Sequence, residues 1–143
     1  MTKTRAVIDL IALLSLSTIA LQVASGGDKA AAKDRLFEMR TYIAAPGKLD
    51  ALNARFRDHT NKLFVKHGMT LIGYWTPVDG EAAKNTLVYI LAYPDKESRE
   101  KSWKAFREDP EWNKARAESE KDGKLVEKVE EKFLKPTDYS PIR

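Results

Sequence analysis

The chain has 143 residues, with 25 lysines and arginines, 21 aspartates and glutamates, and no cysteine. This length allows one domain and argues against two full hydrophobic cores. The missing cysteines exclude disulfides, iron–sulfur clusters, thiolate zinc sites and cysteine nucleophiles. A formal net charge of +4 is far below that of a nucleic-acid-binding arm, so we expect no nucleic-acid partner.

The first 25 residues differ from the rest of the chain and indicate a secretory signal peptide. Lys3 and Arg5 form a short basic start, residues 10–21 are largely apolar, and small residues follow. This order is typical of an export signal, and the apolar stretch is short for a membrane-spanning helix. We therefore expect residues 1–25 to be cleaved and the mature protein to be periplasmic or secreted, without a transmembrane segment. An uncleaved N-terminal membrane anchor and a mitochondrial presequence are the alternatives.

A polar linker at residues 26–34 precedes the domain, which we expect to span residues 35–143. Residues 36–43 alternate in polarity, and this period of two predicts a strand. Pro46 suits the first turn of a helix. Apolar side chains and one histidine then follow at spacings of three and four, which predicts a helix of about 20 residues with one inward stripe. The members of this stripe are Leu49, Leu52, Phe56, His59 and Leu63.

The second half of the domain continues the alternation of strands and helices. We expect a strand at 70–76, a loop at 78–84, a strand at 85–93, a helix at 95–108, a helical piece to residue 121 and a last segment at 124–134. Asp109 and Pro110 supply an N-cap and an N1 proline, which restart the helix. The last segment fits a helix or a strand by its pattern. The order of elements favours the strand, because it completes a β-α-β-β-α-β, ferredoxin-like α+β fold with a four-stranded antiparallel sheet.

Several segments in the same order resemble the NIPSNAP family. They are LFEMRTYIAAPGKLDALNARFRDHT, KHGMTLIGYWTP, NTLVYILAY, SWKAFREDPEW and FLKPTDYSP, which together span residues 36–141. The resemblance implies the dimeric α/β-barrel arrangement, in which two ferredoxin-like subunits place their sheets face to face, and hence a homodimer. It implies no reaction. Animal members of the family are mitochondrial, whereas this N-terminus is typical of an exported protein.

The first strand is expected to lie in the middle of the sheet and to have two unlike faces. Burying lone charges under a helix is costly, so we expect the apolar side chains to face the helices. The helix-facing set is Phe37, Met39 and Thr41, and the dimer-facing set is Glu38, Arg40 and Tyr42. The alternative for the polar face is a solvated surface of a monomer.

Five side chains are candidates for a ligand pocket between helix and sheet. His59 lies in the helical stripe, and either hydrogen-bonds within the core, projects into a pocket or holds haem or a metal. Tyr74 and Trp75 point to opposite faces of their strand, so one of them should line this space together with Trp103, unless these rings only pack the core. Arg55 either clamps an anion or makes a structural salt bridge.

No motif assigns a cofactor or a catalytic group. His59 and His67 are about 12 Å apart on a helix and cannot share one ion, so no metal site is expected. No glycine-rich phosphate loop and no nucleophile motif is present, and we expect no cofactor. Two functions remain. One is a homodimeric domain of unassigned activity that binds a small apolar ligand or a protein partner. The other is a cofactor-independent monooxygenase-like or haem-binding enzyme that uses the helix–sheet pocket.

Overall fold

The computed structural model describes residues 34–143. The predicted signal peptide at residues 1–25 and almost all of the linker at 26–34 lie outside the described residues. The elements in chain order are β1 (Leu36–Ala44), α1 (Leu49–Arg55), the π-helical segment η1 (Phe56–Thr60), α2 (Asn61–Lys66), β2 (Thr70–Trp75), α3 (Ala82–Asn85), β3 (Thr86–Tyr93), α4 (Lys96–Glu108), α5 (Pro110–Ser119) and β4 (Val126–Leu134).

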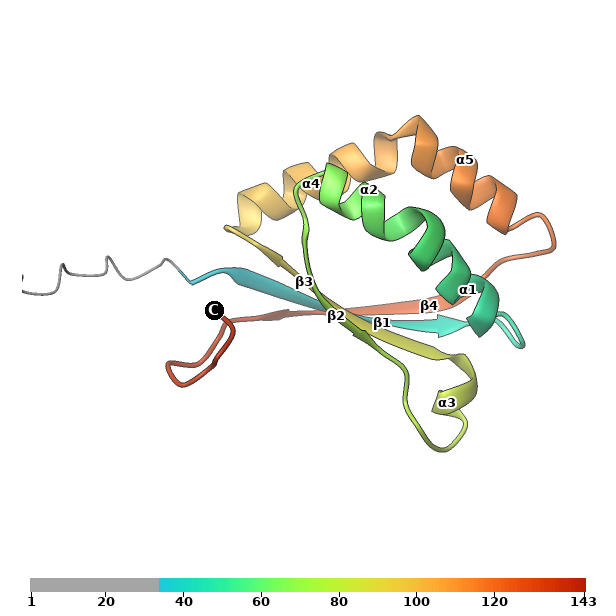
Figure 1. The fold of residues 1–143 in the computed structure, drawn as a ribbon, viewed down its shortest axis with the longest axis horizontal. Helices are drawn as coiled ribbons and strands as arrows, with labels where there is room; N and C mark the ends of the chain where they lie inside the picture. The colour runs from blue at the N-terminus through green and yellow to red at the C-terminus, as the bar shows by residue number, and fades with distance from the viewer. Residues whose placement is uncertain (1–33) are drawn as a thin grey trace, which may run out of the picture. The chain divides into compact units, whose positions relative to one another are not determined.

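The four strands form one antiparallel sheet in the order β2-β3-β1-β4, and α1, α2, α4 and α5 cover one face of it (Figure 1). The prediction of an α+β, ferredoxin-like β-α-β-β-α-β fold is confirmed. Strand β1 lies between β3 and β4, as expected. The ambiguous last segment is a strand, because it pairs with β1 along nearly its whole length.

The helix after β1 is not a regular α-helix throughout. A π-helical segment, η1, separates α1 from α2, and its turn is wider because its hydrogen bonds run from i to i+5. The Thr60 hydroxyl donates to the Arg55 carbonyl at 3.2 Å and satisfies a backbone acceptor at this point. The wider turn changes the phase of the helix, so Thr60 is buried while His59 is only partly buried. The prediction that Phe56 faces inward is therefore correct, but at the next turn Thr60 takes the inward position that was predicted for His59.

The predicted orientation of β1 is wrong. Glu38, Arg40 and Tyr42 face the helices, whereas Phe37 and Met39 belong to the opposite face of the sheet. Glu38 is fully buried and contacts α4 through Arg99 and Trp103, and Tyr42 packs edge-on against Phe56. The expectation assumed that a charge under a helix would lack a partner. Here α4 supplies two donors, so the burial cost of the carboxylate is offset.

Aromatic rings dominate the core between the helices and the sheet. Tyr89 of β3 is fully buried and is surrounded by Phe56, Phe64 and Tyr74 at ring-centroid distances of 5.1, 6.1 and 5.5 Å. Such pairs contribute about 0.5–1.5 kcal/mol each beyond area burial. This cluster packs the helix formed by α1, η1 and α2 against β2 and β3. Different side chains fill the region between the helices and strands β1 and β4. Within residues 34–143, no helix is both long and apolar enough to span a bilayer.

Candidate functional site

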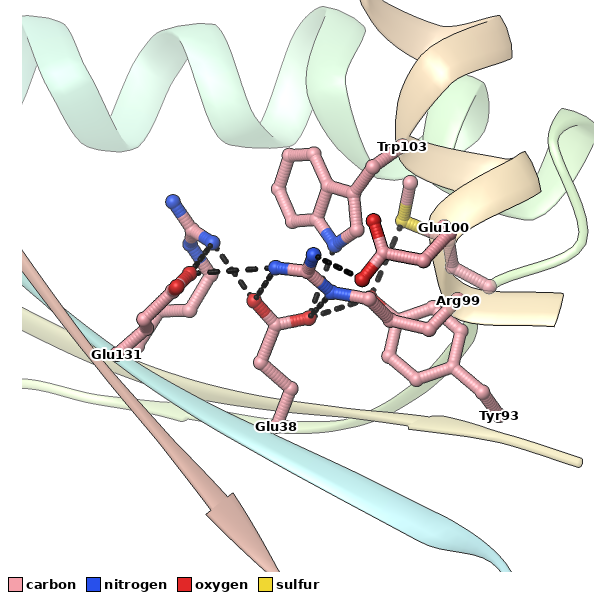
Figure 2. A network of polar contacts seen from close by, with 8 residues as sticks. Glu38, Tyr93, Arg99, Glu100, Trp103 and Glu131 are labelled. Carbon is pink, nitrogen blue, oxygen red and sulfur yellow. Dashed lines mark hydrogen bonds and ion pairs between the residues drawn. The ribbon is translucent and has the colours of Figure 1, made fainter. Parts of the chain in front are cut away.

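A buried carboxylate lies at the centre of the contacts between α4 and β1. Arg99 donates from Nε (3.0 Å) and Nη2 (2.8 Å) to the two oxygens of Glu38. Arg40 Nη1 (2.7 Å), Trp103 Nε1 (2.9 Å) and the Tyr93 hydroxyl (3.0 Å) also donate to this carboxylate. Figure 2 shows Arg99 and Trp103 converging on Glu38 between the helix and the sheet. We call Glu38, Arg40, Tyr93, Arg99 and Trp103 the Glu38 network.

The hydrogen bonds keep Glu38 ionised although it is buried. Burial alone raises the pKa of this carboxyl, but the donors Arg99, Trp103 and Arg40 outweigh burial and lower the pKa to about 2. Burial and the neighbouring carboxylate raise the pKa of Tyr93, so its hydroxyl stays protonated and donates. A carboxylate with so low a pKa is a poor general base at neutral pH. Glu38 therefore serves to fix the positions of two arginines.

Arg40 belongs to the Glu38 network and also lines a pocket over β1 and β4. The pocket has a volume of about 440 Å³, which is the size of many small-molecule sites. Its aromatic and basic lining comprises Tyr42, Trp103, Phe106, Trp112, Arg40, Arg55, Arg107, Arg116 and Lys124. Three glutamates, at 120, 127 and 131, are the acidic side chains in the lining, so bases outnumber acids. We call this hollow the cationic pocket.

The local sequence explains how two walls of the cationic pocket form. Arg55 ends α1 next to the π-helical turn and is buried, with Nη1 donating to Glu120 at 2.9 Å. Trp112 lies in the first turns of α5, which restarts where the Asp109 side chain caps the Glu111 backbone N–H at 2.8 Å. Hydrogen bonds from Lys66 and then His67 hold the pKa of Asp109 well below its ordinary value. The predicted helix restart is confirmed, and it places Trp112 beside Arg55, with 5.4 Å between guanidinium and ring.

The structure brings together only two of the five side chains predicted to line one pocket. Arg55 and Trp103 both line the cationic pocket. Tyr74 stacks on Tyr89 in the core, and burial raises the pKa of its phenol. His59 borders a second hollow, between the first helix and α5, which Arg55 also lines. Trp75 is 52% exposed on the helix-free face of the sheet.

Sequence reasoning assigned Arg40 and Tyr42 to the wrong face and did not single out Trp112 as a pocket residue. Glu38, Arg40 and Tyr42 occupy alternate positions of one strand, so the pattern itself shows that they share a face. The sequence does contain a signal that this face is turned toward the helices. Arg99 and Trp103 lie one helical turn apart on α4, and both can donate hydrogen bonds to a buried carboxylate. These two residues lie four apart and reach the same carboxylate.

Nothing in the described chain forms a metal centre. Across residues 34–143, no group of three or more histidine, aspartate and glutamate side chains could hold an ion. His67 contacts the Asp109 carboxylate at 2.7 Å, and Lys66 Nζ pairs with the same carboxylate at 2.8 Å. The lining of the cationic pocket consists mainly of basic side chains and aromatic rings.

The sheet order and the helices on one face define a ferredoxin-like α+β domain with a ligand-sized pocket between helix and sheet. The NIPSNAP family model matches residues 37–141. The chain belongs to the NIPSNAP family. No curated protein matches the chain.

Solved structures agree with this assignment. A NIPSNAP family protein of unknown function from Agrobacterium tumefaciens is 26% identical, with a TM-score of 0.67 over 78% of this chain and 96% of that one. An uncharacterised NIPSNAP domain protein from Burkholderia xenovorans is 27% identical, with a TM-score of 0.63 over 74% and 98%. SnoaB, a cofactor-independent oxygenase from Streptomyces nogalater, is 12% identical, with a TM-score of 0.50 over 76% and 98%. This last likeness shows the fold alone.

Proposed function

We propose that this NIPSNAP protein is an exported homodimeric domain that binds a small organic ligand in the cationic pocket. The observation that carries the binding function is the pocket itself. It combines a volume of about 440 Å³ with aromatic walls and with more basic than acidic side chains in its lining. A concave site of this size with aromatic walls and a few charged groups is typical of small-molecule binding sites.

The three tryptophans of the chain provide a direct binding assay. Trp103 and Trp112 line the cationic pocket, whereas Trp75 lies on the helix-free sheet face. Their indole N–H signals in ¹H–¹⁵N spectra can be assigned by single Trp→Phe variants and followed during titration with neutral, cationic and anionic aromatic fragments. We expect saturable shifts of the Trp112 signal, with the Trp75 signal unchanged. If no fragment of any charge class shifts Trp103 or Trp112, or if Trp75 shifts equally, the binding function is refuted.

The helix-free face of the sheet supports the homodimer. Alternation along β1 gives this face Met39 and Ile43, and the cross-strand partner of Met39 is Ile90. Trp75 adds an exposed ring on β2. On β4 the same face carries Lys128, Glu130 and Lys132, so the apolar part is a strip over β1, β2 and β3. An apolar strip on a sheet face without helices is typical of a surface that packs on another one, and an isologous interface places the same patch on both copies.

The dimer is tested by light scattering after size exclusion at micromolar concentration. We expect twice the mass of the purified chain for the wild type and a monomer for Ile90→Lys, which places a charge in the middle of the apolar face. Lys104→Glu, on the exposed side of α4, is the control and should leave the mass unchanged. A monomeric wild type would refute the homodimer.

Export is tested on the protein from its own cells. The basic start and short apolar stretch of the first 25 residues support cleavage after Ser25. The intact mass of the purified protein should therefore correspond to a chain that begins at Gly26. A chain that still carries residues 1–25 in the membrane fraction would instead support an N-terminal anchor.

A further inference from the structure

We infer that in the homodimer the residues after β4, 135–143, of each copy pack on Trp75 of the other copy, with Tyr139 as the main contact. We call these residues the C-terminal segment. The inference rests on the proposed homodimer and specifies how its two sheet faces are oriented. It depends on the place of this segment, on two exposed aromatic rings, and on the symmetry of a face-to-face dimer.

The C-terminal segment is fixed at one end of the helix-free face of the sheet. Arg143 donates from Nε (3.2 Å) and Nη2 (2.8 Å) to Asp34 Oδ1, and its main-chain oxygen accepts from Arg35 Nε at 2.7 Å. Apolar side chains of the segment and of β1, β2 and β3 enclose a hollow of about 300 Å³. They include Pro136, Ile142, Phe37, Ile72 and Ile90. Figure 1 shows the segment on the side of the sheet opposite α4 and α5, near the start of β1.

Tyr139 packs little on its own chain, although the segment around it contacts the sheet. Its side chain is 84% exposed, whereas Thr137 and Ser140 on either side border the hollow. A single exposed ring is common on a protein surface. This ring, however, belongs to a segment that lies on the face which the homodimer would cover.

Trp75 supplies a fixed aromatic surface at the other end of the same face, where β2 ends. Its ring lies against Gly73, because a Cβ added at Gly73 would come within 2.6 Å of the indole. The side chain is nevertheless 52% exposed, so part of the ring is open to a partner. A ring that is held in place before association loses little side-chain entropy when a partner packs on it.

Symmetry determines which ends of the two faces meet. Two copies that pack face to face are related by a two-fold axis that lies between the sheets. If this axis runs along the strands, like ends meet, and both C-terminal segments lie between the same two sheet ends and hold them apart. If the axis runs across the strands, unlike ends meet, and each segment lies over the partner's Trp75. The second arrangement covers the exposed rings of Tyr139 and Trp75 in both copies.

The charges at the two ends favour the same arrangement. Lys135 lies in the C-terminal segment, and Asp79 lies four residues beyond Trp75; both are exposed. Contact between unlike ends brings Lys135 toward the partner's Asp79, whereas contact between like ends brings Lys135 toward its own copy. Like charges that face each other across an interface disfavour association.

The chain has no cysteine, so cross-linking of introduced cysteines is a direct test. Tyr139→Cys and Trp75→Cys chains are purified separately, mixed, allowed to exchange and treated with a short bismaleimide. We expect linked dimers mainly in the mixture and only background linking in either variant alone. Asp138→Cys with Thr76→Cys repeats the test with both rings retained. Val65→Cys, an exposed position on α2, replaces Tyr139→Cys in the control mixture and should give background linking.

The strength of the contact is measured by dilution of the dimer in light scattering. Tyr139→Ala should raise the dissociation constant of the dimer by about tenfold, which is a typical cost of removing an aromatic anchor. Tyr139→Phe keeps the ring and should remain close to the wild type. Thermal melts establish that each variant is folded.

Each outcome has a distinct meaning. Linking of Tyr139→Cys chains to one another shows that like ends meet, and it refutes the inference while the homodimer stands. A dimer in light scattering without linking in either cysteine pair, or with equal linking in the control mixture, has the same consequence. An unchanged dissociation constant in Tyr139→Ala refutes the contact of Tyr139. A monomeric wild type refutes the proposed homodimer and this inference together.

Discussion

Replacing Glu38 by glutamine should strongly destabilise the domain, even though the two side chains have the same shape. Glu38 is fully buried, and it lies between Arg40 and Arg99, which are only 13% and 11% exposed as side chains. Glutamine removes the negative charge and turns one acceptor into a donor that faces N–H groups. Removing one partner of a buried ion pair costs about 3–5 kcal/mol, because the remaining charges stay buried without compensation.

The pKa shift of Glu38 gives an independent value for the same loss of unfolding free energy. The drop in pKa from 4.5 to about 2 corresponds to roughly 3 kcal/mol of folding free energy. Because the pKa is lower in the folded protein, this stabilisation is fully present above pH 4.5 and is lost as the pH falls toward 2. The difference between wild type and Glu38→Gln should therefore be largest at neutral pH and should shrink between pH 4.5 and 2.

Urea denaturation followed by circular dichroism at pH 7 and pH 3 measures this difference at a fixed protein concentration. Glu100→Gln is the matched control, because Glu100 also pairs with Arg99, at 3.2 Å, but its side chain is 55% exposed. Exposed pairs contribute about 0–1 kcal/mol, so this variant should remain close to the wild type. A loss below 1 kcal/mol for Glu38→Gln at pH 7, or a difference that does not depend on pH, would refute the reasoning.

Substitutions at three further positions test the elements around the site. Thr60→Val removes the hydroxyl that donates to the buried Arg55 carbonyl, and it should lower the unfolding free energy by roughly 1–3 kcal/mol in urea titrations; an unchanged value would mean that another donor reaches this carbonyl. Gly68 has φ +79°, and an added Cβ would meet only Ser102 at an ordinary 3.6 Å, so Gly68→Ala should cost about 1–2 kcal/mol from the backbone alone, as measured by the same titration. Asp109→Ala should lower the melting temperature more than Asp109→Asn, because asparagine keeps the helix cap while both lose the charge; equal melting temperatures would show that the cap has little effect.

The fold could be predicted because periodicity and turn residues act locally. Asp109 and Pro110 mark the helix restart by their own conformational preferences, and Gly68, with its positive φ, marks the end of the first helix. The final strand was ambiguous by pattern, and only the number and order of the other elements identified it. These features depend on neighbours in the sequence, so they are visible without the tertiary structure.

The site could not be predicted to the same degree, because it depends on partners far apart in the sequence. Whether Glu38 faces inward depends on Arg99 and Trp103, which lie 61 and 65 residues further on. A rule that keeps charges away from helices fails where the helix brings the counter-charge. The partial burial of His59 has a different cause: a regular 3.6-residue period was assumed, and the structure departs from it at η1.

The π-helical segment also has a consequence for comparing this chain with its relatives. Four positions spaced by four residues, Leu52, Phe56, Thr60 and Phe64, are all buried, although a regular α-helix would rotate the last by about 120° from the first. The extra width of η1 cancels most of this rotation. Deleting one residue from η1 would turn one half of the helix by about 100° relative to the other and move Arg55 away from Trp112. A relative with a one-residue gap at this point would keep the fold but present a different set of side chains to the space between this helix and the sheet.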